Sequence, residues 1–242
     1  MEDYFGLEVE GADFEMAQAS VIEFGTGEDC ANFAEWIRGA DIAKLQERVL
    51  IIGDGEDCLH FAEAVQGADI ERLQERVLEI GDGFDCFRFS MFVTKRLKGT
   101  DIEKFQERVL EVGTGFDCWR FAVFVKGADT AKLQERVIEI GIGDDFHHFA
   151  LNVKGADIAK LQERVLEIGT GADCCLFAEF VKGADIAKLQ ERVIELDNSY
   201  DCICFAYRVK GADVEKLHAR IKNLSALRNH KICNQRNYVE LQ

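Results

Sequence analysis

The sequence of 242 residues contains no proline, and no apolar run approaches the roughly 18 residues that a membrane-spanning helix requires. Without proline, helices can run uninterrupted, and other residues must make the turns between them. The N-terminus, Met1-Glu2-Asp3-Tyr4, lacks the basic and apolar regions of a secretory signal. We therefore expect a helical, cytoplasmic protein with no membrane contact.

Basic residues are scarce relative to acidic ones. The chain holds 29 Lys and Arg against 45 Asp and Glu, which gives a formal net charge of −16. Direct binding to nucleic acid is disfavoured, because that affinity comes largely from cations that neutralise phosphates. An acidic surface instead favours a basic protein as the partner.

A repeated segment dominates the chain. Neighbouring copies begin 28 residues apart, except for one interval of 32 residues. A fixed period of about 20–50 residues is typical of solenoids and arrays. We expect a single repeat domain over residues 1–224, with a half-repeat at 1–10, followed by a tail at 225–242 that either caps the array or hangs free. The copies begin at Gly11, Gly39, Gly67, Gly99, Gly127, Gly155, Gly183 and Gly211.

Residues 155–182 show the pattern of one repeat. Ile158, Leu161, Val165 and Ile168 recur at helical spacing and lie on one face of a helix. Asp157 can cap the first turn, and Gly169 can end the helix in the left-handed conformation.

A shorter second helix follows, with Cys174, Phe177, Ala178 and Val181 on one face and Asp173 as its candidate cap. A helical hairpin of this kind cannot bury its apolar stripes alone. Stacking about seven of them predicts an all-α fold, an α-solenoid.

Gln162 occupies a position that is glutamine in almost every copy. One interpretation places these amides at the seam between repeats, where they bond to the backbone of the next repeat. The other makes them helix-favouring residues on a solvated surface, and the buried fraction distinguishes the two. The equivalent residues are Gln18, Gln46, Gln74, Gln106, Gln134, Gln190 and His218.

The pattern Gly-Ala-Asp-Ile-x-Lys-Leu-Gln-Glu-Arg-Val, followed by Phe-Ala-x-x-Val-Lys, resembles the short two-helix solenoid repeats. That broad class includes HEAT-like and tetratricopeptide-like arrays, and the resemblance covers residues 1–224. The period of 28 is shorter than in either, and the tetratricopeptide Trp, Tyr and Pro landmarks are missing. The resemblance implies a superhelical scaffold that binds other molecules.

The copies diverge mainly in the second helix, at positions that face away from its apolar stripe. In the third and fourth repeats these positions are aromatic and rimmed by arginine, a composition typical of interaction sites. The alternative is that curvature or the C-terminal tail covers them as ordinary core. The candidate partner-binding residues are Trp36, Phe84, Phe87, Arg88, Met91, Phe92, Phe116, Trp119, Arg120, Phe124, His147, His148, Phe180 and Tyr207.

Four extra residues lie within 93–98, which adds about one helical turn. Leu97 can then continue the stripe of Val93. Lys95, Arg96 and Lys98 would form a local basic cluster.

Nine cysteines suggest a disulfide framework, but six of them occupy one repeat position. Packed helices lie about 8–10 Å apart, farther than the Cα separation of about 4.4–6.8 Å in a disulfide. Reduced thiols are therefore predicted, which agrees with a location inside a cell. The six are Cys30, Cys58, Cys86, Cys118, Cys174 and Cys202.

The reactive residue types give no recognisable active site. The pair His147-His148 resembles metal ligands, yet adjacent helical residues point about 100° apart and the next repeat lies a full helix spacing away. The loops 53–57 and 81–85 faintly resemble calcium or phosphate loops, but turn and cap chemistry explains every residue. We predict no catalytic residue, no cofactor and no metal ion.

The leading hypothesis is a non-enzymatic scaffold that binds a protein or peptide through the variable face of the second helices. The same aromatic patch would serve self-association into a homodimer. An alternative is an acidic decoy, or inhibitor, that occupies a nucleic-acid-binding protein. A third is an enzyme with a pocket that no motif reveals.

Overall fold

The computed structural model describes residues 11–96 and 102–239, with their side chains except at 12, 94, 96 and 227–239. The described residues form fifteen α-helices and no β-strand. None of these helices combines the length and the apolar character needed to cross a membrane. The described chain is thus all-α, as the sequence predicts.

The helices alternate between the first and second helix of each repeat. The first helices are α1 (Ala12–Phe24), α3 (Ile42–Ile52), α5 (Ile70–Ile80), α7 (Ile102–Val112), α9 (Thr130–Ile140), α11 (Ile158–Ile168) and α13 (Ile186–Glu195). The second helices are α2 (Gly27–Trp36), α4 (Gly55–Ala64), α6 (Gly83–Arg96), α8 (Gly115–Phe124), α10 (Gly143–Asn152), α12 (Gly171–Phe180) and α14 (Ser199–Arg208). The last helix, α15 (Val214–Val239), begins as a first helix and includes residues 225–239 of the tail.

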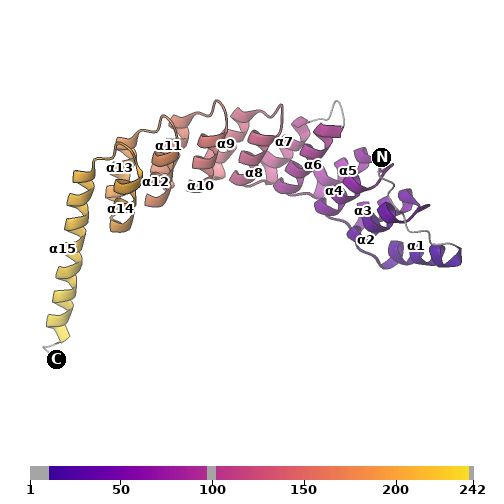
Figure 1. Ribbon diagram of the computed structural model, residues 1–242, viewed down its shortest axis with the longest axis horizontal. Helices are drawn as coiled ribbons and strands as arrows, with labels where there is room; N and C mark the ends of the chain where they lie inside the picture. The colour runs from indigo at the N-terminus through magenta and orange to yellow at the C-terminus, as the bar shows by residue number, and fades with distance from the viewer. Residues whose placement is uncertain (1–10, 97–101, 240–242) are drawn as a thin grey trace. The chain divides into compact units, whose positions relative to one another are not determined.

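These helices group into two compact units, unit 1 (residues 1–129) and unit 2 (residues 130–242). Within each unit, each second helix packs on the first helix that follows it and on the second helix of the next repeat (Figure 1). Each unit is therefore a stack of helical hairpins, and the fold class is the α-solenoid predicted. The predicted half-repeat at 1–10 lies outside the described residues, and a single domain over 1–224 stays a prediction.

The first helices begin as the sequence predicts. The Asp157 side chain accepts a hydrogen bond from the backbone N–H of Lys160 at 3.2 Å, which caps α11. Gly155 has φ of 86°, in the left-handed region that glycine tolerates best. The prediction for Gly169 is wrong, because its φ of −70° is not left-handed. A Cβ there would lie 2.5 Å from the Val165 carbonyl oxygen, so this glycine is needed for space.

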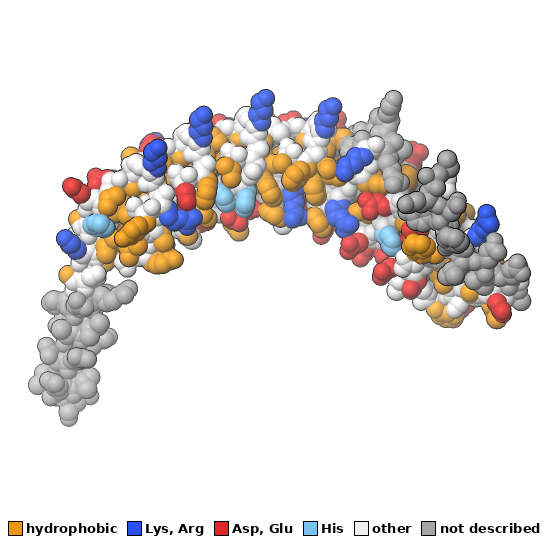
Figure 2. All heavy atoms as spheres, in the orientation of Figure 1, with side chains coloured by type: hydrophobic (Ala, Val, Ile, Leu, Met, Phe, Trp, Pro, Cys, Tyr) orange, Lys and Arg blue, Asp and Glu red, His pale blue; other side chains and the backbone are white. Residues whose placement is uncertain are grey.

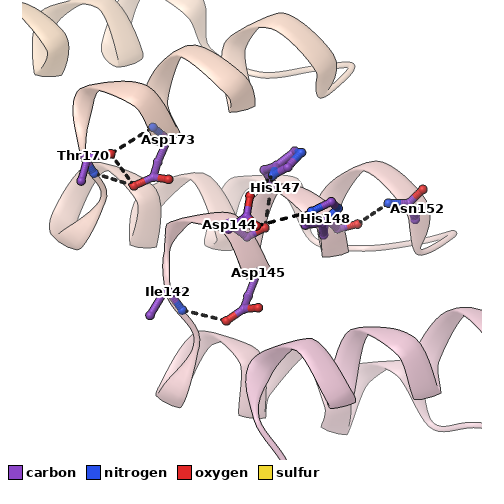
Figure 3. Close-up of polar contacts among 8 residues, drawn as sticks. All are labelled: Ile142, Asp144, Asp145, His147, His148, Asn152, Thr170 and Asp173. Carbon is purple, nitrogen blue, oxygen red and sulfur yellow. Dashed lines mark hydrogen bonds and ion pairs between the residues drawn. The ribbon is translucent and has the colours of Figure 1, made fainter. Parts of the chain in front are cut away.

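The second helices begin earlier than predicted. Thr170 is the N-cap of α12, and Asp173 lies three residues inside it. The two residues form a reciprocal capping box: Thr170 N donates to Asp173 Oδ2 at 2.7 Å, and Asp173 N donates to Thr170 Oγ1 at 3.2 Å (Figure 3). The prediction of Asp173 as the cap itself is wrong, because its carboxylate reaches back to the true cap.

The loop at residues 53–57 has the structural role predicted for it. Asp54 and Asp57 form a capping box at the start of α4. A Cβ at Gly55 would collide with the carboxylate of Asp85, which belongs to the next repeat. Glycine is therefore required where successive second helices approach each other most closely.

The glutamine column lies at the seam between repeats. Gln46 is only 4% exposed, its Nε2 donates to the Asp69 carbonyl oxygen at 2.8 Å, and the Asp69 N–H donates to its Oε1 at 2.8 Å. This amide clamp joins a first helix to the N-cap of the next, and the seam interpretation is confirmed. An Asp N–H donates to the glutamine 23 residues earlier in the pairs Gln18–Asp41, Gln106–Asp129, Gln134–Asp157, Gln162–Asp185 and Gln190–Asp213.

The buried stripe of the first helix is shorter than predicted. Leu161 and Val165 are fully buried, and Ile158 is half-buried. Ile168, the last residue of α11, is an exposed residue, so the stripe stops one turn before the helix ends.

The inserted residues lengthen a second helix. With 14 residues, α6 is one turn longer than the ten-residue α4 and α8, as the insertion predicts. Lys95 is exposed at this added turn. The predicted roles of Leu97 and Lys98 fall outside the described residues, as does that of the Arg96 side chain.

The cysteine column lies in the core of the described hairpins. The six cysteines of this column are buried free thiols. Burial raises the pKa of Cys58, Cys86 and Cys174 from 9.0 to about 12. These thiols behave as small apolar core residues.

Candidate binding surface

Three of the variable positions lie near the start of each second helix. They are the second, fifth and sixth residues of the helix, as in Phe84, Phe87 and Arg88 of α6. Because they are spaced i, i+3 and i+4, their side chains lie on the same side of the helix. Each repeat therefore presents one triplet, and the triplets differ.

The aromatic residues of the α6 and α8 triplets, together with Phe124 at the end of α8, form a continuous aromatic cluster in unit 1, made of Phe84, Phe87, Phe116, Trp119 and Phe124. Ring centroids lie 6.3 Å apart for Phe84–Phe87 and 4.9 Å apart for Phe116–Trp119. Phe124 joins the two helices, at 6.1 Å from Phe87 and 6.4 Å from Trp119. These separations are typical of favourable aromatic pairs. Phe124 is 52% exposed, so the cluster reaches the surface.

Two arginines lie against the aromatic cluster. The guanidinium of Arg120 lies 4.2 Å from the ring centroid of Phe116 and 4.9 Å from that of Phe84. Arg88 lies 5.7 Å from the Phe84 centroid and also pairs with Glu56 at 2.8 Å. Cations within about 6 Å of a ring face are attracted by its quadrupole. The arginines therefore hold the exposed rings in place, as the predicted rim requires.

Phe92 does not face outward, and its prediction as a surface residue is wrong. It is 7% exposed and packs edge-on against the fully buried Phe89, at a centroid distance of 5.9 Å. Its counterpart Phe124 is the last residue of α8, whereas α6 continues to Arg96. The extra turn thus places Phe92 inside a helix, and only the half-buried Met91 beside it reaches the surface.

His147 is also buried, contrary to its prediction as an outward-facing residue. It is 8% exposed, and the equivalent residues Leu59 and Cys175 are buried too. The fifth position is thus buried in α4, α10 and α12, whereas Ile203 at the same position of α14 is 41% exposed. The neighbouring His148 is half-buried.

The remaining predicted residues are exposed but do not belong to the aromatic cluster. Trp36 ends α2, Phe180 ends α12, and Tyr207 lies near the end of α14. All three are among the exposed large hydrophobic side chains. The structure therefore brings together the predicted residues of the third and fourth repeats in one cluster and His147 with His148 in α10, and it leaves Trp36, Phe180 and Tyr207 apart.

A groove of about 390 Å³ borders the aromatic cluster in unit 1. Its walls come from α4 and α6 and are mostly apolar. The lining residues are Leu59, Glu63, Phe87, Arg88, Met91, Phe92 and Lys95.

A second groove, of about 470 Å³, adjoins the first because Glu63 and Arg88 line both. It is strongly acidic, and acidic side chains gather on the face of unit 1 seen in Figure 2. Burial raises the pKa of Asp57 in this groove, and the nearby charges of Asp54 and Glu28 raise it further. The lining residues are Glu28, Asp54, Glu56, Asp57, His60, Glu63 and Arg88.

Sequence reasoning missed this acidic groove. Its carboxylates come from α2, from α4 and from the loop before α4, so no single repeat contains the site. The available signal was the glutamate at the second position of two successive second helices, Glu28 and Glu56.

A different triplet occupies α10 in unit 2. Asp144, His147 and His148 offer ligand atoms that all lie within 4.8 Å of one another (Figure 3). The sequence argument against a metal here looked for a further ligand in the next repeat. The third ligand instead comes from the same helix, one turn before the two histidines.

Comparison with family models, with curated proteins and with solved structures finds no match to this chain. The class of protein is therefore defined by the fold alone, which is a helical-repeat solenoid.

Proposed function

We propose that this protein is a non-enzymatic binding protein, and that unit 1 binds a segment of another protein that carries apolar and basic side chains. The observation that carries this proposal is the acidic groove that adjoins the aromatic cluster. The resemblance to HEAT-like and tetratricopeptide-like arrays supports it, since scaffolds of that class bind other molecules.

The aromatic cluster would supply most of the affinity. Exposed Phe84, Phe116 and Phe124 can bury large apolar areas against a partner. Their ring contacts and the stacked arginines limit side-chain motion, so little entropy is lost on binding. Aromatic and arginine residues are the types that dominate binding energy at interfaces.

The acidic groove would select the charge of the partner. Five carboxylates line it against one arginine, and that arginine is already paired with Glu56. A lysine or arginine of the partner placed here would meet a group of carboxylates whose charge, together with that of Arg88, is net negative. This attraction steers association and weakens as salt screens it.

Selection from a random peptide library displayed on phage tests the proposal. We expect the selected peptides to combine aromatic or aliphatic residues with Lys or Arg. The variant carrying Phe84→Ser, Phe116→Ser and Phe124→Ser should bind them at least about a hundredfold more weakly, because interface aromatics typically contribute about 2 kcal/mol or more each. Calorimetry measures the affinity, and circular dichroism checks that helicity is retained.

Phe180→Ser is the matched control, because it removes an aromatic side chain that is equally exposed at the end of a second helix in unit 2. It should leave affinity unchanged. Selection of no peptide, or equal binding by the triple variant, would contradict the proposal. A dimer that the triple variant abolishes would make a second copy of the chain the occupant instead.

A further inference from the structure

The triplet in α10 has a composition that the proposed binding surface does not use. Asp144, His147 and His148 are the second, fifth and sixth residues of that helix. Nδ1 of His147 lies 3.3 Å from one carboxylate oxygen of Asp144, and Nε2 of His148 lies 3.6 Å from the other. The carboxylate therefore contacts both imidazoles, one through each of its oxygens (Figure 3).

Helical spacing explains this convergence. Neighbouring residues of a helix point about 100° apart, so His147 and His148 alone would diverge. Asp144 precedes them by three and four residues, and residues at those spacings are neighbours on the helix surface. The two rings also lie close, with centroids 4.2 Å apart.

We propose that Asp144, His147 and His148 bind one divalent transition-metal ion such as zinc. Imidazole nitrogen together with one carboxylate oxygen suits zinc, nickel and copper, whereas magnesium and calcium prefer sites made of oxygen alone. Three ligands from one helix leave at least one position of the ion open to water or to a ligand from a partner.

The surroundings of His147 favour this role. Its side chain is largely buried, so its orientation is restricted. Its Nδ1 lies near both the carbonyl oxygen of Asp144, at 3.2 Å, and the carboxylate, so this nitrogen binds the ion in the tautomer that carries the ring proton on Nε2.

The other repeats supply internal comparisons. Among the described residues, only this triplet brings three such ligands together. The second repeat has Glu56, Leu59 and His60 at the same positions, so it offers one carboxylate and one imidazole but no second imidazole.

Equilibrium dialysis of the full chain against Zn²⁺, followed by metal analysis, tests the site. We expect one equivalent of zinc to bind the unmodified protein. His147→Leu, His148→Asn and Asp144→Ala should each weaken binding at least tenfold. Each substitute is the residue that another repeat carries at that position, namely Leu59, Asn32 and Ala172, so the hairpin should still fold.

His60→Gln is the control, because it removes the matched histidine of the second repeat and should leave zinc affinity unchanged. Electron paramagnetic resonance of bound Cu²⁺ should show imidazole nitrogens as ligands, and His148→Asn should alter that signal. No stoichiometric binding of zinc would overturn the site. Binding that survives both histidine substitutions but is lost on thiol alkylation would place the metal on cysteines and overturn it equally.

Discussion

The first helices α3, α5, α7, α9, α11 and α13 share nearly all of their side chains, whereas the second helices share mainly the residues that face the hairpin core. In the first helices, Leu161, Gln162 and Val165 represent columns that are buried in most of the described repeats. A substitution at one of these positions would alter the seam between two repeats. The same seam geometry recurs between the neighbouring repeats. The uniform helices therefore specify how the repeats stack.

The second helices combine a uniform face with a variable one. Phe177 and Cys174 are fully buried and represent columns shared by most of the repeats. The triplet positions vary because each triplet contacts only its neighbours or solvent. A position that differs between repeats is not always exposed. His147 and Cys175 occupy such a position, and both are buried. A variable position between second helices needs to fit only the adjacent repeat.

The largest expected contrast is in thiol reactivity between the uniform and variable positions of the second helices. The thiolate is the nucleophile, and a rise in the pKa of Cys174 from 9.0 to about 12 lowers the ionised fraction at pH 8 about a thousandfold. Iodoacetamide should therefore label Cys174 at least that much more slowly in the folded protein than in urea. Labelling should accelerate about tenfold per pH unit below pH 12. Peptide mass spectrometry gives the rates.

Cys204, a half-buried residue at a triplet position, is the internal comparison. It should react with the reagent faster than Cys174 in the same folded sample. Equal rates for Cys174 in the folded and unfolded protein would show that the cysteine column is not protected by the hairpin core.

Core leucine truncation should separate the two kinds of helix in stability. Leu161 is fully buried on α11, whereas Leu151 on α10 is 48% exposed. Leu161→Ala should lower the free energy of unfolding by about 3 kcal/mol or more, because it removes apolar contacts and leaves a cavity. Leu151→Ala should cost less than about 0.5 kcal/mol, since exposed positions make few contacts. Urea denaturation measures both, and similar losses would refute the assignment of Leu161 to the buried stripe of the first helices.

The helices themselves were predictable from sequence, because local signals encode them. The spacing of Leu161 and Val165 gives the buried face, and Asp157 gives the helix start. The role of Gln162 was not predictable, because it lies at the edge of the apolar stripe, where a polar side chain suits either solvent or a seam. How deeply Gln162 is buried depends on how the next repeat packs against it, and the periodicity within one helix does not describe that packing.

The aromatic cluster was also predictable, because its residues repeat at matching positions of adjacent copies. The prediction that Phe92 faces outward is wrong, because the extra turn of α6 changes the surroundings of this side chain. The acidic groove was not predicted, because its carboxylates come from two different repeats, on α2 and on α4 with the loop before it. The proximity of Asp144 to His147 and His148 was missed because the sequence argument looked for a further ligand in the next repeat and not one turn earlier on the same helix.

The smallest expected effect tests the amide clamp of the uniform helices. Gln46→Met keeps the length and approximate volume of the side chain but removes both hydrogen bonds to Asp69. The Asp69 carbonyl oxygen still accepts from the Leu73 N–H at 3.3 Å, whereas the Asp69 N–H loses its partner. The clamp is only part-buried, and a hydrogen bond contributes about 0.5–1.5 kcal/mol net, so we expect the free energy of unfolding to fall by about 1–2 kcal/mol. Gln66→Met, at an exposed glutamine in the loop before α5, should change it by less than about 0.5 kcal/mol. Amide hydrogen exchange should also accelerate at Asp69 in the Gln46 variant alone, and unchanged exchange there would show that the clamp does not hold the repeats together.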